Sequence, residues 1–143
     1  MSLSKLAEQA PPGAVALART ILEQALVDER WAAGIGPVLS QRDVARLLVK
    51  TPQAVAQDQR LLRLRQRDGR PVYPVFQFDG RRQVEGVAEV VATLREVVEP
   101  LSIAAWLAGP NRRLGGKRPV ELLRRGRTGQ VMAAAVRYAR AAA

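Results

Sequence analysis

The chain has 143 residues, of which 48% are hydrophobic, and it carries a formal net charge of +10. It contains no cysteine and no histidine, which excludes disulfides, thiolate metal sites and any Ser-His-Asp catalytic arrangement. We therefore expect no enzyme, no catalytic residues, no metal site and no cofactor. No apolar run approaches the roughly 20 residues of a membrane span, and no secretory signal is recognisable, so we expect a cytoplasmic protein without a membrane partner.

The positive charge is concentrated in two blocks. Residues 1–39 have a net charge of −1 and residues 40–82 one of +6, whereas residues 83–111 have −3 and residues 112–143 have +8. Arginine supplies most of this charge, and its planar guanidinium suits phosphate and carboxylate groups. We therefore expect a polyanion or an acidic partner, although a solvated basic surface is compatible with the same composition.

The first predicted elements are helices. Apolar residues recur at helical spacing over residues 14–31, before Gly34 and Gly36 end that helix. Ser40 and Asp43 then form a capping-box pattern, which predicts a helix that begins at Gln41.

A second start signal, Thr51-Pro52, follows the Gln41 helix closely, so the sequence predicts two short helices joined by a tight turn. This pair resembles a helix-turn-helix, and a plain helical hairpin is the alternative. In such motifs the second helix presents its first turn and its next exposed positions to base edges in the major groove. The residues expected to contact DNA in this way are Thr51, Gln53, Gln57 and Arg60.

A β-hairpin is predicted at Asp68-Gly69, which lies between two alternating apolar runs, and we expect a type I′ turn with positive φ at both residues. Such a hairpin would be a wing whose arginines contact phosphates, namely Arg63, Arg65, Arg67 and Arg70. Pro71 and Pro74 favour an exposed edge strand. Leu61 to Arg65 fits either the wing strand or a continuation of the second helix.

The rest of the chain is predicted to be helical. Apolar spacing predicts an amphipathic helix over residues 84–98, and further helices are expected over residues 100–107, 119–125 and 130–140. The basic stretch at Gly115-Gly116 is no P-loop, because Asn111 stands where its first glycine should be and Arg118 where its hydroxyl residue should be. We interpret it as a structural corner with positive φ at both glycines.

The second half of the chain resembles the toxin-binding domain of the Xre/MbcA/ParS family of antitoxins. The resemblance covers residues 84–143, in matching order and spacing. The residues that carry it are Trp106-Leu107, Pro110-Asn111, Leu114-Gly115-Gly116, Pro119, Glu121-Leu122-Leu123, Gly126 and the alanine-rich last helix.

The resemblance implies an antitoxin that neutralises a RES-type toxin, an enzyme that degrades NAD, by covering its active site with the C-terminal region. The toxin-binding residues implied by position are Asn111, Arg112, Arg113, Tyr138, Arg140, Ala141, Ala142 and Ala143. Repression of its own operon, by a homodimer on double-stranded operator DNA, is also expected. The alternative is a DNA-binding transcriptional regulator or chromosome-associated protein without a toxin partner.

The expected fold class is mainly α. A helix-turn-helix with a short β-hairpin wing is predicted over residues 1–82, and a helical toxin-binding domain over residues 83–143.

Overall fold

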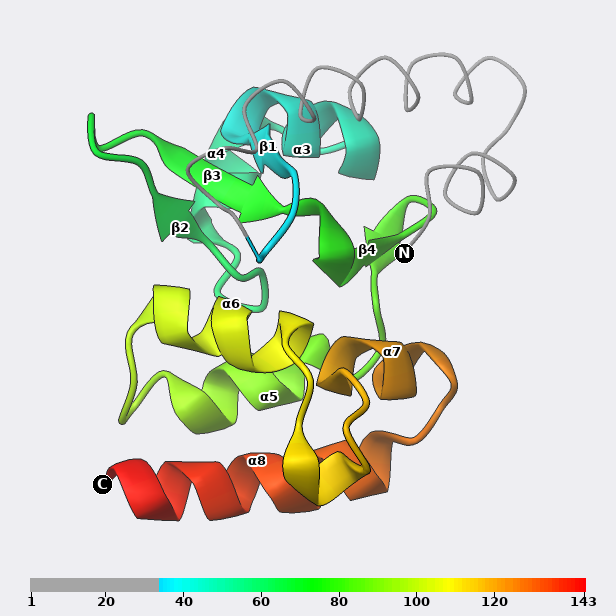
Figure 1. Ribbon diagram of the computed structural model, residues 1–143. Helices are drawn as coiled ribbons and strands as arrows, with labels where there is room; N and C mark the ends of the chain where they lie inside the picture. Colours follow the sequence, from blue (N-terminus) through cyan, green and yellow to red (C-terminus); the bar gives the residue numbers. More distant parts are fainter. Residues whose placement is uncertain (1–33) are drawn as a thin grey trace.

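The computed structural model of the protein describes residues 34–143 (Figure 1). The helix predicted over residues 14–31 lies outside this range. The described residues form helices and a small antiparallel sheet, and none of their helices is long and apolar enough to cross a membrane.

The first half of the described chain contains a three-stranded sheet and two helices. The elements follow one another as β1 (Val38–Ser40), α3 (Gln41–Leu48), α4 (Pro52–Gln57), β2 (Leu64–Arg65) and β3 (Pro71–Pro74). The sheet is antiparallel with the order β1-β3-β2, so β3 lies in the middle.

Both predicted helix starts are confirmed. The Ser40 hydroxyl accepts a hydrogen bond from the Asp43 backbone N at 3.1 Å, and α3 begins at Gln41. The Thr51 hydroxyl accepts one from the Ala54 backbone N at 3.1 Å, at the start of α4. Each hydroxyl satisfies a backbone donor that has no partner within its own helix.

The hairpin between β2 and β3 is confirmed, but the predicted type I′ turn is wrong. Only Gly69 has a positive φ, of 87°, and its backbone N donates to the Gln66 oxygen at 2.9 Å. The Gln66 backbone N in turn donates to the Arg70 oxygen at 3.0 Å, so the loop has three residues rather than two. Such loops place one residue, usually glycine, in the left-handed region.

The expectation that the two prolines mark an edge strand is also wrong, because β3 is the central strand. Pro71 pairs with β2 but lies beyond the last pair with β1, which is Ser40 with Val72. Pro74 pairs with β1 but lies beyond the pairs with β2. Each proline therefore has one side without a neighbouring strand, where a missing N–H costs no ladder hydrogen bond.

The segment between α4 and β3 is also settled. Helix α4 ends at Gln57 because Asp58 is extended, and Leu64–Arg65 is strand β2, so a helix that continues to Arg65 is wrong. Strand β2 is short because the backbone of Leu62, just before it, is hydrogen-bonded to a side chain rather than to a neighbouring strand. The buried Gln77 amide accepts a hydrogen bond from the Leu62 backbone N at 2.9 Å and donates one to the Leu62 oxygen at 2.8 Å.

After β3 the chain forms a short linking region and then a layer of helices. The linking region contains η2 (Val75–Gln77), β4 (Phe78–Asp79) and β5 (Arg82–Gln83). The helices are α5 (Val87–Leu94), α6 (Pro100–Ala108), η3 (Arg112–Leu114), α7 (Pro119–Arg124) and α8 (Thr128–Ala142). The predicted helix over residues 84–98 is correct only at its centre, because Gly86, with φ of 95°, precedes α5.

The predicted corner at Gly115-Gly116 is confirmed. Both glycines have positive φ, of 68° and 78°. The backbone N groups of Gly116 and Asn111 donate to the oxygens of Asn111 and Lys117 at 2.8 and 3.0 Å, which closes the loop on itself. The corner returns the chain from α6 towards α7 and places η3 in front of α8 (Figure 1).

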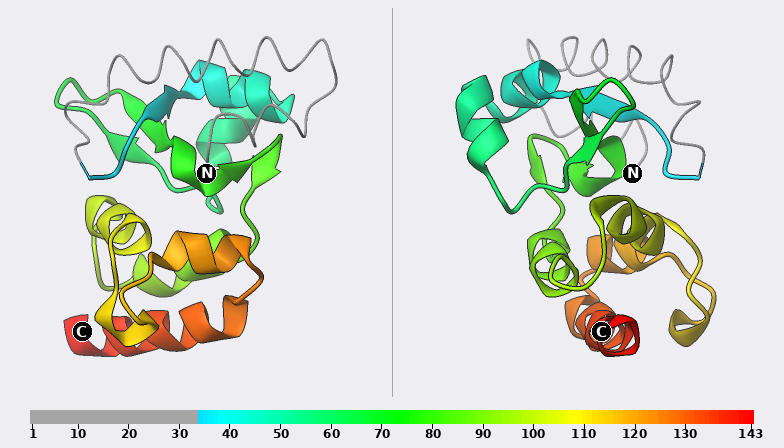
Figure 2. Two further views of the ribbon diagram at one scale, coloured as in Figure 1. Left: turned by 45° about the vertical axis from the view of Figure 1, so that its right-hand side comes forward. Right: turned by 90° about the vertical axis from the view of Figure 1, so that its left-hand side faces the viewer.

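The sheet lies between two layers of helices, and the alternation of its residues explains why (Figures 1 and 2). Successive residues of a strand point to opposite faces. Val38 and Val72 belong to a large apolar cluster with α5 to α8, whereas Leu39 and Tyr73 belong to a smaller one with α3 and α4. The large cluster crosses the predicted domain boundary after residue 82, so the two halves share a core.

A buried arginine also connects the two halves. The Arg124 guanidinium, on α7, donates to the Phe76 backbone oxygen in η2 and forms an ion pair with Glu121 at 2.6 Å. Its side chain is only 4% exposed, and this burial lowers the pKa of Arg124 to about 10.

Candidate functional site

Helix α4 presents most of its surface to solvent. Val55 is its one buried residue, at 1% exposure, and it anchors the helix in the smaller apolar cluster. Thr51, Gln53 and Gln57, three of the residues expected to contact DNA, are exposed around this anchor. The position of α4 is fixed against α3, because the Gln41 side chain donates to the Pro52 oxygen at 2.9 Å.

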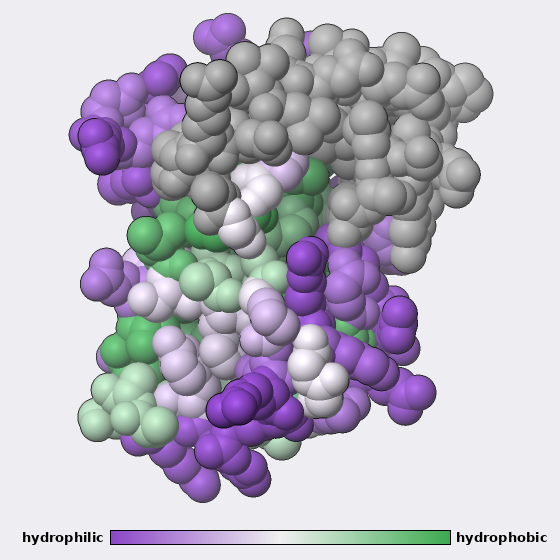
Figure 3. Space-filling view, in the orientation of Figure 1, coloured by the Kyte–Doolittle hydropathy of each residue, from purple (hydrophilic) through white to green (hydrophobic). Residues whose placement is uncertain are grey.

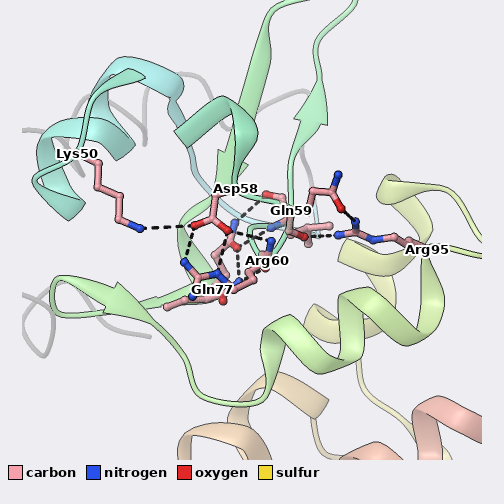
Figure 4. Close-up of polar contacts among 8 residues, drawn as sticks. Lys50, Asp58, Gln59, Arg60, Gln77 and Arg95 are labelled. Carbon is pink, nitrogen blue, oxygen red and sulfur yellow. Dashed lines mark hydrogen bonds and ion pairs between the residues drawn. The ribbon is translucent and has the colours of Figure 1, made fainter. Parts of the chain in front are cut away.

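Arg60 differs from the other predicted DNA contacts because it is already paired with an acid (Figure 4). Its Nε and Nη2 donate to the two Asp58 carboxylate oxygens at 3.0 and 3.1 Å, and Lys50 lies 3.6 Å from the same carboxylate. These hydrogen bonds from Arg60 lower the pKa of Asp58 and raise the pKa of Arg60. A phosphate would therefore have to compete with Asp58 for both cations.

Arg63 is also held inside the structure. It is half-buried, and its Nη1 donates to the Ala56 backbone oxygen at 3.0 Å, so it supports α4 rather than the hairpin. It lies near Tyr73, whose hydroxyl is buried, and this burial raises the pKa of Tyr73. The loop next to Arg63 is tied to α5 by Arg95, which donates to the side chain and backbone oxygen of Gln59.

The remaining hairpin arginines are exposed, and they differ in whether their guanidinium groups already have a hydrogen-bond or ion-pair partner. Arg65 donates to the Gly69 oxygen at 2.9 Å, and Arg70 forms an ion pair with Asp68 at 2.7 Å. Arg67, at the tip, has no ion pair or side-chain hydrogen bond within residues 34–143. Arg65, Arg67 and Arg70 therefore form one basic surface, and α4 with its capping residue forms a polar one.

Three basic residues of the helix pair were not among those predicted from the sequence to contact DNA. Arg42 and Arg46 are exposed on α3, four residues apart and therefore on one side of the helix, and Lys50 lies in the turn before α4. The four-residue spacing of Arg42 and Arg46 is the sequence signal that could have predicted a basic side of α3.

A second surface gathers most of the residues implied to bind a toxin. Asn111, Arg112, Arg113, Tyr138 and Ala141 line one depression of about 310 Å³, together with Trp106, Pro110, Ala134 and Arg137. Tyr138 stacks on Trp106 with ring centroids 5.9 Å apart. Arg140, Ala142 and Ala143 do not line the depression, although all three are exposed at the end of the chain. Arg137, which was not predicted from the sequence, does line it.

Neither surface contains the donor set of a metal centre. No group of three or more acidic side chains that could hold a metal ion occurs within the described residues. Both surfaces contain cationic guanidinium groups and side-chain amides, and the second also contains a pair of stacked aromatic rings.

Comparison with known proteins gives information about the fold alone. No protein-family model matches the sequence, and no curated protein matches it. The chain is similar to the NMR structure of Rv2175c, with 24% sequence identity and a TM-score of 0.61 over 72% of this chain and 81% of that one. The likeness supports the arrangement of helices and small sheet described above.

Proposed function

We propose that the protein binds double-stranded DNA, with α3 and α4 as a helix-turn-helix and the β2–β3 hairpin as its wing. The observation that carries the proposal is the chain order β1, α3, α4, β2, β3, in which two short helices are followed by a two-stranded hairpin. One side of α4 is exposed, and so are the three hairpin arginines, Arg65, Arg67 and Arg70. Gln53 and Gln57 would face base edges, and Arg65, Arg67 and Arg70 would contact phosphates. The +6 charge of residues 40–82 favours such a partner.

Fluorescence anisotropy with duplex DNA tests this proposal. We expect affinity to fall steeply between about 50 and 300 mM salt, because each neutralised phosphate releases counterions. Arg67→Ala should reduce the logarithmic salt slope by about 1 and weaken binding to all duplexes alike. Gln53→Ala and Gln57→Ala should instead reduce discrimination between sequences and leave the slope unchanged.

Arg127→Ala provides a matched control, since Arg127 is an exposed arginine at the start of α8, in the other layer of the molecule. It removes the same charge and should change the slope less than Arg67→Ala does. An affinity that does not respond to salt, or equal effects of the two substitutions, would contradict the proposed interface.

A second candidate function is the neutralisation of a RES-type toxin by the C-terminal half. The observation that favours it is the gathering of Asn111, Arg112, Arg113 and Tyr138 at one surface beside the exposed chain end. Deletion of residues 139–143 should restore toxicity when the toxin is co-expressed and leave duplex binding intact. A deletion that abolishes both activities would contradict this division. A DNA-binding regulator without a toxin partner would show duplex binding and no neutralisation.

A further inference from the structure

The depression beside η3 is a groove whose floor is formed by two aromatic rings, those of Trp106 and Tyr138. It is bounded by the end of α6, by Pro110 to Arg113 and by the last turns of α8, and its volume is about 310 Å³. Trp106 and Tyr138 are half-buried and stack with their planes 19° apart, so they stabilise each other while part of their surface stays open. Such a floor suits an apolar side chain.

Three arginines line this groove without an acidic partner. Arg112, Arg113 and Arg137 are exposed, and no Asp or Glu within residues 34–143 forms an ion pair with any of them. The Asn111 side chain accepts a hydrogen bond from the Arg113 backbone N at 2.9 Å, which fixes the loop but leaves the guanidinium free. The groove thus combines unpaired positive charge with an apolar floor, so it is complementary to an acidic segment with an exposed apolar side chain.

The same protein contains such a segment in the turn between α5 and α6. Glu96 and Glu99 are exposed there, and neither has an ion-pair partner in the described part of the chain. Leu101, two residues after Glu99, is 52% exposed, although large apolar side chains are normally buried. Figure 3 shows apolar surface at the left edge of the molecule, level with this turn.

We propose that the groove binds the α5–α6 turn of a second copy of the chain. Leu101 would cover the Trp106–Tyr138 pair, and Glu96 and Glu99 would face the three arginines. In a twofold dimer each copy supplies both surfaces, so the contact is made twice. A duplex is disfavoured as the occupant because α4 and the hairpin lie at the opposite end of the molecule (Figure 2). Only this exclusion of a duplex rests on the proposed function; the match of charge and apolar surface between the groove and the turn does not depend on it.

Sedimentation velocity on the full chain tests the contact by exchanging charges. We expect the protein to dimerise with increasing concentration, and Arg137→Glu or Glu99→Arg alone to weaken the dimer at least ~10-fold. The combined variant, Arg137→Glu with Glu99→Arg, should recover much of the lost affinity, because the opposite charges face each other again. Arg127→Glu, which reverses an exposed arginine outside the groove, should leave the dimer unchanged, and circular dichroism will show that each variant is folded.

Three outcomes would overturn the proposal. The first is a monomer up to about 100 μM, a concentration at which a specific interface of standard size would be populated. The second is a dimer insensitive to both single reversals, and the third is a double variant no stronger than the single ones. Duplex binding is measured separately with the α4 and hairpin variants, so failure here and failure of the DNA proposal are distinguishable.

Discussion

At the scale of single residues, Val49 has a backbone conformation that its side chain opposes. It lies in the turn between α3 and α4 with φ of 55° and ψ of 54°, and it is the one non-glycine residue with positive φ among those described. A β-branched residue in this region costs about 1–2 kcal/mol. Val49 is 75% exposed, so packing does not compensate for this cost.

Replacement of Val49 by glycine should therefore stabilise the protein. The relief of strain is partly offset by the greater freedom of glycine in the unfolded chain, so we expect a net gain of about 0.5–1 kcal/mol in the free energy of unfolding. Urea denaturation measures it, and Val49→Ala, which keeps a Cβ atom in the same conformation, should gain less. Loss of stability in the glycine variant would show that the valine side chain makes a contact that its exposure does not suggest.

Among the residues of this region, we expect the protonation of Asp58 to have the largest effect on the free energy of unfolding (Figure 4). Its pKa is lowered below 3.8 in the folded protein, chiefly by the hydrogen bond from the Arg60 side chain. Because a lowered folded-state pKa means that the unfolded chain binds the proton more readily, the stabilisation is complete above the unfolded value. It is lost as the pH falls through the lower, folded value.

We expect Asp58→Asn to make the stability less dependent on pH below about 4, and to cost about 1 kcal/mol at pH 7, as for a well-formed, partly exposed ion pair. Thermal denaturation between acidic and neutral pH measures both effects. Asp68→Asn is a matched control, because Asp68 also pairs with an arginine two residues later but is far more exposed, at 52% against 10%. Equal effects of the two substitutions would contradict the idea that burial makes the Asp58 pair the stronger one.

At the scale of elements, the sequence predicted the helix starts correctly, whereas the local Asp68-Gly69 signal gave the hairpin but the wrong turn type. Ser40 and Thr51 predicted two helix starts correctly, because a hydroxyl cap needs only the next three residues. The central position of β3 could not be predicted, since it depends on pairing with β1, more than 30 residues earlier along the chain. The groove residue Arg137 was missed for the same reason, because only the fold brings α8 beside η3.

Gly86 lies where the start of α5 closely approaches α7. It precedes α5 with φ of 95°, and a Cβ atom added there would lie 2.6 Å from Cδ2 of Leu123 on α7. Leu123 is buried, so it cannot move away freely. We expect Gly86→Ala to cost about 2–4 kcal/mol, the sum of backbone strain and overpacking.

Gly115→Ala is the matched control for Gly86→Ala. Gly115 also has a positive φ, of 68°, but a Cβ atom added there meets no other atom within 4 Å. Only the backbone strain of about 1–2 kcal/mol should therefore appear in its free energy of unfolding. Equal losses in the two variants would show that α5 and α7 can separate without cost.

At the scale of the whole molecule, the sheet holds the two halves together. The predicted helix-turn-helix with its wing and the toxin-binding resemblance divide the sequence into residues 1–82 and 83–143. In the structure, Val38, Leu64 and Val72 belong to the same apolar cluster as α5 to α8. Arg124 adds a polar connection between α7 and η2. An apolar core shared in this way favours unfolding as a single unit.

Val72→Ala should therefore destabilise both halves together, although the substitution lies in a strand of the first. We expect a loss of about 2 kcal/mol, from the removal of buried methyl groups and the cavity that remains. In a Trp31→Phe background, Trp106 fluorescence reports on the helical layer and far-ultraviolet circular dichroism on the whole chain. The two probes should give the same urea midpoint before and after the substitution. A midpoint that shifts for circular dichroism but not for Trp106 would show that α5 to α8 fold without the sheet, and that the shared cluster contributes little to their stability.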